Sequence, residues 1–292
     1  MRARKVSAFA PGKLIVTGEH SVVYGYQAIA MAVDLGVWVE LEEIGGESVV
    51  ENGDTLISSA IKTLLPPRGI KMSFRSNLPI GRGMGSSAAL SIAFIRALAR
   101  WENRESTFEE EFQKGLQLET FFHGNPSGLD HTVSSRGQTL IYTKSSQGPK
   151  TEPLPSFGLS LVIVDSGSAG NTAQMVQIVK DNYKRNQVFL KQLGAITLRI
   201  KEQLVQATLD ERKLGTLFVE NHQLLQKIGV STPALNHIVA EALARGALGA
   251  KLSGSGGGGI VMILTKNPQR MLEEMNQLGY KGFIVRPYSR PH

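Results

Sequence analysis

Short apolar runs, some of them alternating with polar residues, occur near the start of the chain and again towards its end. Such runs are typical of strands with one or both faces buried. Near the start they predict strands at Val6–Ala10, Leu14–Thr17, Val33–Glu42 and Lys71–Arg75. Further strands are predicted at Gly137–Tyr142, Leu159–Asp165, Ile260–Thr265 and near Gly282–Arg286.

Longer segments show helical patterns and helix-ending signals. Helices are predicted at Asp54–Leu65, Ala88–Trp101, Ser106–Phe122, Glu211–Lys227, Pro233–Arg245, Pro268–Leu278 and over most of Asn171–Leu209. Strands and helices follow one another without regular alternation, which favours an α+β fold over a doubly wound parallel sheet. Prolines, glycines and serines between residues 144 and 158 indicate a domain boundary. We therefore expect one domain over residues 1–155 and a second over residues 156–292.

The composition is that of an ordinary globular protein, with 41% apolar and 20% charged residues among 292. There is no cysteine, which excludes disulfides and thiolate metal sites. The apolar stretch after the basic residues Met1–Lys5 is too short for a signal peptide. No run reaches the roughly 18 apolar residues of a spanning helix. We therefore expect a cytoplasmic protein with no membrane partner.

The chain carries a formal charge of +7, from 32 basic and 25 acidic residues. A positive field can attract an anionic ligand such as a nucleotide, and it can equally attract nucleic acid. The basic residues are scattered, and no arginine-lysine run is interleaved with aromatic residues. The charge therefore favours a small anionic ligand or a merely solvated surface, and we expect no nucleic-acid partner.

A glycine-rich segment, Pro79–Ser87, leads directly into a predicted apolar helix. Glycines let the backbone approach a ligand and adopt positive φ, and the free N–H groups at a helix start attract anions. Ser86 and Ser87 could add hydroxyl ligands for phosphate or a metal. The segment is not a P-loop, and its dinucleotide-like pattern Gly83-Met-Gly-Ser-Ser-Ala88 lacks the following strand with its acidic residue. It predicts a phosphate-binding loop, although a serine-capped turn is the simpler alternative.

Two carboxylates follow this loop. Glu119 falls on the predicted buried face of its helix with Phe112 and Leu116, and a buried carboxylate is costly unless it is paired or binds a cation. In a phosphate-binding enzyme its natural partner is Mg²⁺, although the head group could instead reach solvent. Asp130 ends the turn His123-Gly-Asn-Pro-Ser-Gly-Leu-Asp130 and is expected to open a helix. It is either a helix cap or the acid–base group of phosphoryl transfer.

Polar groups in two further segments are candidates for the same site. Lys13 precedes an apolar strand, where a cation seldom lacks a function, and Glu19 and His20 follow a glycine turn. The stretch Lys251-Leu-Ser-Gly-Ser-Gly-Gly-Gly-Gly259 precedes a predicted buried strand. This position indicates close backbone packing, a second phosphate contact or only a tight loop. The six histidines show no spacing typical of a zinc site.

Three of these segments, in this order, resemble the superfamily of galactokinase, homoserine kinase, mevalonate kinase and phosphomevalonate kinase. They are Pro11-Gly-Lys-Leu, Gly83-Met-Gly-Ser-Ser-Ala88 and Lys251-Leu-Ser-Gly-Ser-Gly-Gly-Gly, and they span nearly the whole chain. Two stretches, Gly18-Glu-His-Ser-Val-Val-Tyr-Gly25 and His123–Asp130, look like the mevalonate kinases within it. His131 and Gly170 depart from the pattern, which usually has asparagine at the first position and often a basic residue at the second.

The resemblance implies a two-domain fold that holds ATP, Mg²⁺ and a small alcohol, most closely mevalonate, between the domains. The nucleotide loop would comprise Pro79, Ile80, Gly81, Arg82, Gly83, Met84, Gly85, Ser86, Ser87, Ala88 and Ala89. Mg²⁺ would bind Ser87 and Glu119, and Asp130 with Lys13 would be the catalytic pair. Substrate contacts would come from Lys13, Glu19, His20, Asp130, Thr172 and Ser253. The resemblance also allows a homodimer.

Three alternatives stay open. The chain could be another kinase of the superfamily, a dinucleotide-dependent oxidoreductase, or a non-catalytic protein that binds nucleotide or nucleic acid. A phosphomevalonate site should offer several cations to hold the phosphate that this substrate already carries. Near the proposed pocket only Lys13 and His20 qualify, and Lys13 is expected to keep Asp130 ionised. Mevalonate, which has no phosphate, is therefore favoured.

Overall fold

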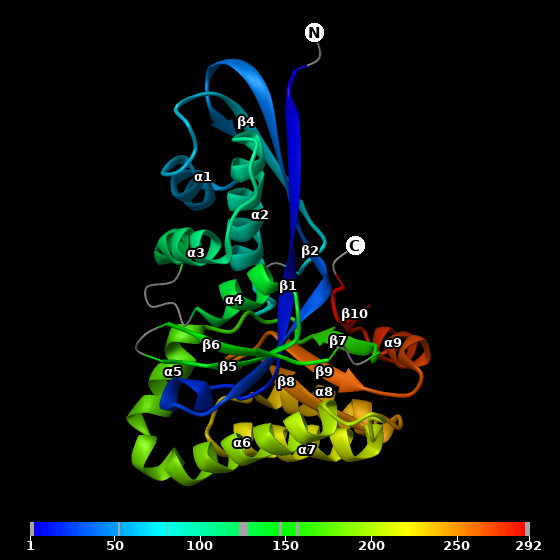
Figure 1. Cartoon of the computed structure of the whole chain (residues 1–292). Coiled ribbons are helices and arrows are strands. Elements are labelled where there is room, and N and C mark those ends of the chain that lie inside the picture. Colours follow the sequence, from blue (N-terminus) through cyan, green and yellow to red (C-terminus); the bar gives the residue numbers. More distant parts are fainter. Residues whose placement is uncertain are drawn as a thin grey trace.

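Figure 1 shows two sheet-based halves stacked along the long axis of the molecule. The computed structural model describes residues 3–51, 53–79, 81–122, 128–145, 148–155 and 158–289, and the backbone only of Phe122. Helices and strands are mixed in both halves, so the prediction of an α+β fold is confirmed. No helix in the described part of the chain is both long and apolar enough to span a membrane.

The N-terminal sheet has the order β3-β4-β2-β5-β6, with β1 also paired to β2. Its strands are β1 (Lys5–Thr17), β2 (Ala28–Glu47), β3 (Val49–Val50), β4 (Arg68–Ser76), β5 (Leu140–Thr143) and β6 (Lys150–Pro153). The prediction of two short strands around Pro11 was wrong, because β1 continues through this position. The proline has no N–H for the ladder, and the register with β2 shifts between Pro11 and Lys13 instead of ending there.

Four helices accompany this sheet: α1 (Thr55–Lys62), α2 (Ser86–Trp101), α3 (Phe108–Phe122) and α4 (Leu129–Arg136). Asp54 caps α1 by accepting a hydrogen bond from Ile57 N at 2.8 Å, as its residue type favours. The long middle of α2 is buried between β1, β2 and α3, which explains its apolar sequence. Asp130 lies in the first turn of α4, so the prediction that it opens a helix is confirmed.

The C-terminal sheet is antiparallel, in the order β10-β7-β9-β8. Its strands are β7 (Leu161–Asp165), β8 (Gly249–Ser253), β9 (Ile260–Leu264) and β10 (Lys281–Val285). Its helices are α5 (Thr172–Asp181), α6 (Tyr183–Leu204), α7 (Glu211–Lys227), α8 (Pro233–Ala244) and α9 (Pro268–Gln277). β8 was not predicted, because its glycine and polar residues hide a strand that is buried between β9 and α7.

The two halves are joined at several places. Tyr288, beyond β10, donates its N–H to Ala32 O in β2 at 2.8 Å. The end of β1 reaches β8, and the short 3₁₀ helix η1 (Ser21–Tyr24) packs on α6. Buried apolar residues of both halves belong to one connected core. The residues between the halves are therefore held in a defined arrangement.

Candidate active site

Lys13 and Asp130 form an ion pair at the centre of the site. Lys13 Nζ lies 3.1 Å from Asp130 Oδ1 and donates a hydrogen bond to Gly83 O at 3.0 Å. The Lys13 side chain is only 4% exposed, whereas that of Asp130 is 31% exposed. A buried ammonium needs such partners to offset its desolvation. Asp130 is thus charge-paired on one side and accessible on the other, as an acid–base group must be.

The glycine-rich loop wraps this pair. Gly81, Gly83 and Gly85 all have positive φ, of 70°, 78° and 72°. A Cβ on Gly85 would lie 3.1 Å from Lys13 Cγ and 3.7 Å from Asp130 Oδ2, so only glycine lets the loop approach the pair so closely. The loop is also tied to β1, because Lys13 N donates to Met84 O at 2.9 Å.

The start of α2 offers an anion site beside the pair. Gly85 is its N-cap and makes no side-chain capping bond, so the first N–H groups of the helix are not capped by it. Ser86 and Ser87 are partly exposed in the first turn, whereas Ala88 and Ala89 are fully buried beneath them. Aligned N–H groups and the helix dipole at such an end favour phosphate.

The other predicted loop members take different places. Pro79 is partly buried, and Ile80 lies outside the described residues. Arg82 Nε forms an ion pair with Asp165 Oδ2 at the end of β7, at 2.8 Å. This pair connects the loop to the C-terminal sheet.

A second glycine-rich loop, residues 254–259, lies against the first. A Cβ on Gly259 would lie 3.3 Å from Arg82 O, and one on Gly254 would lie 3.9 Å from Gly83 O. Gly254 and Gly259 have positive φ, as do the three glycines between them at 256–258. Of the options left open for this stretch, close backbone packing is confirmed, and it sets the second glycine-rich loop beside the first.

Glu19 and His20 lie where β1 meets the second loop. Glu19 forms a buried ion pair with Lys251 of β8, and Lys251 Nζ also donates to Leu252 O at 2.8 Å. Glu19 Oε2 has no hydrogen-bond partner among the described residues. Burial raises the pKa of Glu19 and lowers that of Lys251, and the attraction between the two charges opposes both shifts.

His20 and Thr172 both contact Ser255 of the second glycine-rich loop, whereas Ser253, two residues earlier, contacts β1. A ring nitrogen of His20, Nε2, lies 2.8 Å from Ser255 O, and burial lowers the pKa of this ring. Thr172 Oγ1, at the start of α5, lies 3.0 Å from Ser255 Oγ. Ser253 Oγ accepts from Ile15 N and donates to Ile15 O, at 3.1 and 2.9 Å. The structure therefore gathers these predicted residues, and the hydroxyl of Ser253 is engaged by the β1 backbone.

Glu119 is buried on α3, as the helical spacing predicts, with an exposed fraction of 7%. Its Oε2 lies 2.5 Å from Nδ1 of His131, the residue next to Asp130. His131 fits there because Gly115 of α3 leaves room for its ring, which a Cβ on Gly115 would approach to 2.5 Å. The residue that departs from the family pattern is thus the partner of the predicted metal ligand.

The second departure, Gly170, has a steric reason. A Cβ at this position would lie 2.3 Å from Gly256 O, closer than real Cβ atoms approach any backbone atom. The backbone at residue 170 packs directly on the second glycine-rich loop. No side chain, basic or otherwise, fits here without moving that loop.

Three residues near the site were not predicted as members. Lys251 is the partner of Glu19, and it could have been suspected because it opens the third motif. His222 of α7 accepts from Leu252 N and is near Lys251. Burial, followed by the charge of Lys251, lowers its pKa to about 4. Tyr142 of β5 is buried, and burial together with the Asp130 charge raises its pKa to about 12.

Residues 55–138 match the GHMP kinases N terminal domain, and residues 200–281 match the GHMP kinases C terminal model. The chain belongs to the GHMP kinases. Mevalonate kinase of Pyrococcus furiosus is 35% identical to it, over 91% of this chain and 91% of that protein. Mevalonate kinase of Thermococcus gammatolerans is 36% identical, over 91% of this chain and 90% of its own. Within the GHMP kinases, the chain therefore belongs to the mevalonate kinase family.

Among solved structures, that of L. major mevalonate kinase in complex with R-mevalonate superposes with a TM-score of 0.85. The two sequences are 26% identical, and the match covers 98% of this chain and 97% of that one. The match extends over both halves of the molecule. It therefore confirms the predicted two-domain architecture of the family.

Proposed function

We propose that this chain transfers the γ-phosphoryl group of ATP to the primary hydroxyl of (R)-mevalonate. The observation that carries the proposal is the Lys13–Asp130 pair set against Gly85 at the start of α2. This arrangement brings a carboxylate, a cation and a phosphate-binding helix end to one point. Family membership and the neighbour crystallised with R-mevalonate support the choice of substrate.

The chemistry follows from these positions. The substrate oxygen attacks the γ-phosphorus, the bond from that phosphorus to the bridging oxygen breaks, and ADP leaves. Asp130 accepts or orients the hydroxyl proton, and its ion pair with Lys13 holds that carboxylate in place. The N–H groups of residues 85–88 bind phosphate oxygens. Because phosphoryl transfer requires little covalent help, positioning and charge neutralisation supply most of the rate.

Ser87 and Glu119 would hold Mg²⁺. They fit the ion in chemistry, because hydroxyl and carboxylate oxygens are the donors it prefers, and Glu119 is a buried carboxylate whose only described partner is a histidine ring. Mg²⁺ supplies charge neutralisation on the β- and γ-phosphates when it is bound. Glu19, His20, Thr172 and Ser253 would line or support the substrate pocket.

A phosphorylated substrate is disfavoured by the use of the local cations. Lys13 is paired with Asp130, Arg82 with Asp165 and Lys251 with Glu19. Each of these three charges is already balanced within the described residues. A substrate that already carries a phosphate, such as phosphomevalonate, would need cations that are not paired in this way.

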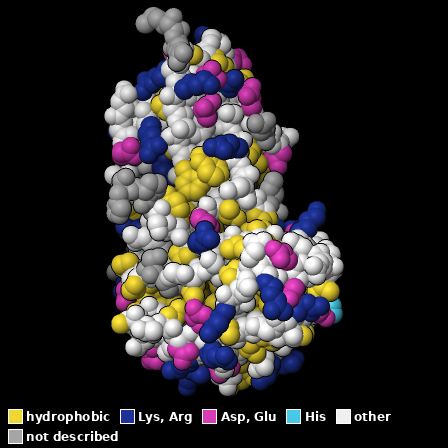
Figure 2. Space-filling model, turned by 90° about the vertical axis from the view of Figure 1, so that its right-hand side faces the viewer, with side chains coloured by type: hydrophobic (Ala, Val, Ile, Leu, Met, Phe, Trp, Pro, Cys, Tyr) yellow, Lys and Arg dark blue, Asp and Glu magenta, His cyan; other side chains and the backbone are white. Residues whose placement is uncertain are grey.

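Scattered surface charge agrees with a small-molecule enzyme. Figure 2 shows Lys and Arg side chains dispersed among Asp and Glu on one face, with no continuous basic stripe.

We propose that the enzyme works in the cytoplasm. We also propose that the chain divides into domains at residues 155 and 156, between the last strand of one sheet and the first strand of the other.

The test is a coupled ADP-release assay with mevalonate, phosphomevalonate, homoserine and galactose at one concentration. We expect mevalonate to give the highest kcat/KM. A higher value for phosphomevalonate or a sugar would contradict the substrate assignment and leave the superfamily intact. If no alcohol stimulates ADP release, the kinase proposal itself fails.

A further inference from the structure

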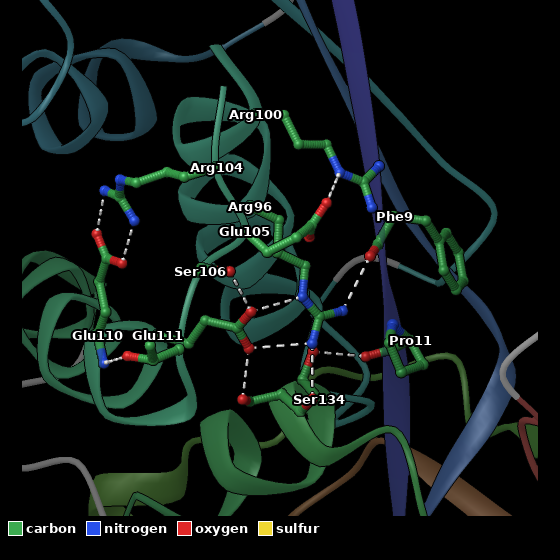
Figure 3. Close-up of polar contacts among 12 residues, drawn as sticks. Phe9, Pro11, Arg96, Arg100, Arg104, Glu105, Ser106, Glu110, Glu111 and Ser134 are labelled. Atoms are coloured by element: carbon green, nitrogen blue, oxygen red, sulfur yellow. Dashed lines mark hydrogen bonds and ion pairs between the residues drawn. The ribbon is translucent and has the colours of Figure 1, made fainter. Parts of the chain in front are cut away.

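A buried network around Arg96 joins the segments that carry Lys13 and Asp130. Arg96 lies on α2 with 8% of its surface exposed, and Figure 3 shows its guanidinium between Glu111 and the backbone of β1. Its Nε donates to Glu111 Oε1 at 2.8 Å, and its Nη2 to Glu111 Oε2 at 3.0 Å. Glu111 also accepts from Ser106 Oγ at 2.6 Å and from Ser135 Oγ at 2.5 Å. Both members of this buried pair are thus well satisfied.

The same guanidinium also reaches two backbone carbonyls on different elements. Nη1 donates to Phe9 O of β1 at 3.0 Å, and Nη2 donates to Ser135 O of α4 at 2.6 Å. Phe9 lies four residues before Lys13, and Ser135 lies five residues after Asp130. One side chain therefore connects the strand that carries the cation to the helix that carries the carboxylate.

A further bond connects the same two elements closer to the reacting groups. Ser134 Oγ donates to Pro11 O at 2.7 Å, and the two residues are buried (Figure 3). Pro11 lies two residues before Lys13 at the register shift of β1, where its carbonyl is available to a side chain. Ser134 follows Asp130 by one helical turn.

We propose that Arg96 is a positioning residue, which sets the distance between Lys13 and Asp130 by holding β1 and α4 in register through Phe9 O and Ser135 O. This inference rests on the proposed roles of Lys13 and Asp130. Lysine cannot replace Arg96, because the planar fork directs several N–H groups at once to a carboxylate and to two carbonyls. Misplacement by about 1 Å of groups that act by positioning can lower the rate by about 100-fold.

Arg100 provides a matched control one turn further along α2. Its Nη1 also donates to a β1 carbonyl, Ser7 O at 2.8 Å, but its side chain is 44% exposed. It bonds to Ser7 and forms an ion pair with Glu105, and neither of these residues lies on α4. Arg96→Lys and Arg100→Lys therefore remove the same type of group from the same helix, and only the first change removes a side chain that bonds both β1 and α4.

The experiment measures kcat, the KM values for ATP and for mevalonate, and the affinity for nucleotide. All measurements are made at a temperature well below the thermal unfolding midpoint of each variant. We expect Arg96→Lys to lower kcat by about 30-fold to 100-fold with nucleotide affinity within about 3-fold, and Arg100→Lys to leave kcat within about 2-fold. Ser134→Ala, a milder change, should lower kcat by about 3-fold to 10-fold, and it keeps the proposal testable if Arg96→Lys folds poorly. Unchanged kcat in Arg96→Lys, or in Ser134→Ala when Arg96→Lys is not folded, would overturn the inference.

A double-mutant cycle with Asp130→Asn separates positioning from general damage. If Arg96 acts through Asp130, Arg96→Lys should have little further effect on kcat when the carboxylate is already absent. An equal loss of kcat in both backgrounds would show a merely structural role and overturn the inference. If Asp130→Asn itself keeps normal turnover, the proposed function fails instead, so the two failures are distinguishable.

Discussion

Two buried ion pairs, Arg96–Glu111 within the N-terminal half and Glu19–Lys251 between the two halves, differ in how completely their polar atoms are satisfied. In the N-terminal half both oxygens of Glu111 accept hydrogen bonds, and Arg96 also donates hydrogen bonds to two backbone carbonyls. In the pair that joins β1 to the C-terminal sheet, Glu19 Oε2 has no partner among the described residues. Removing two charges from water costs several kcal/mol per ion, and only good geometry with further hydrogen bonds offsets this cost.

The difference indicates two uses of buried charge. The satisfied pair fixes backbone segments relative to one another, and both of its carboxylate oxygens already accept hydrogen bonds. The Glu19 pair keeps an unmatched carboxylate oxygen beside His20 and the second glycine-rich loop, where substrate is proposed to bind. Polar groups that are incompletely satisfied occur more often where a ligand or a reaction completes them.

The largest expected effect is on the free energy of unfolding, when one member of a buried ion pair is replaced by an uncharged residue. Replacing the second member as well then tests whether the stranded charge caused the loss. Lys251→Met leaves Glu19 buried and unpaired, and we expect the free energy of unfolding to fall by about 3–5 kcal/mol. Adding Glu19→Gln should restore more than half of that loss, because the stranded charge is gone. Urea unfolding measures both changes.

The corresponding double variant of the other pair, Arg96→Met with Glu111→Gln, serves as the comparison. It should show no such recovery, because the carbonyls of Phe9 and Ser135 still lack their donor. If both double variants regained the same share of the lost free energy of unfolding, the distinction between the two pairs would be wrong.

The pH dependence of stability should come partly from His222, which lies beside Lys251. Its pKa is lowered from 6.5 to about 4 in the folded state, by burial first and the Lys251 charge second. The unfolded chain therefore binds a proton at a higher pH than the folded chain does. The free energy of unfolding should fall as the pH drops from about 6.5 to about 4, by about 3 kcal/mol for this group.

The pKa of Glu19 is raised in the folded state, so protonation of Glu19 makes the free energy of unfolding rise as the pH falls, opposite to the effect of His222. The contribution of His222 is therefore taken as the difference between the wild type and His222→Asn. The variant should show a flatter pH dependence of the unfolding free energy than the wild type. A substitution of the exposed His237 of α8 is the control. Identical slopes for wild type and His222→Asn would contradict the neutral, buried assignment.

A smaller effect is expected at the third buried carboxylate, Glu119, which pairs with His131 rather than with a lysine or arginine. Glu119→Gln keeps the size of the side chain and should leave the fold intact. The Mg²⁺ concentration for half-maximal turnover should rise by about 10-fold or more, as loss of a metal ligand predicts. Glu109→Gln, at an exposed position of α3, should change nothing. An unchanged Mg²⁺ requirement would place Glu119 outside the metal site.

Much of the fold could be predicted because its signals are local. Asp210 and Thr232 are residue types that cap helices, and they cap α7 and α8. The bounds predicted for α7 are the observed ones. β8 and β6 were missed, since β8 looks like a loop in sequence and β6 contains few apolar residues. Their pairing with strands elsewhere in the chain decides their conformation.

The site was predictable where motifs carry it and not where distant residues meet. The motifs led to Lys13, Asp130 and the glycine-rich loop, which the structure brings together, while their catalytic roles stay predictions. The part of His123–Asp130 at residues 123–127 lies outside the described residues. The partnership of Glu19 with Lys251 joins positions 232 residues apart, and no local pattern indicates it.

The most direct measurement identifies the product of wild type and Asp130→Asn with ATP and (R)-mevalonate. We expect the wild type to form mevalonate phosphorylated on the primary hydroxyl, located by phosphorus–proton NMR coupling. Asp130→Asn should form it about 10²-fold to 10⁴-fold more slowly with nearly unchanged ATP affinity, because only the carboxylate is lost. A product phosphorylated elsewhere, no product from the wild type, or equal rates for both proteins would contradict the account.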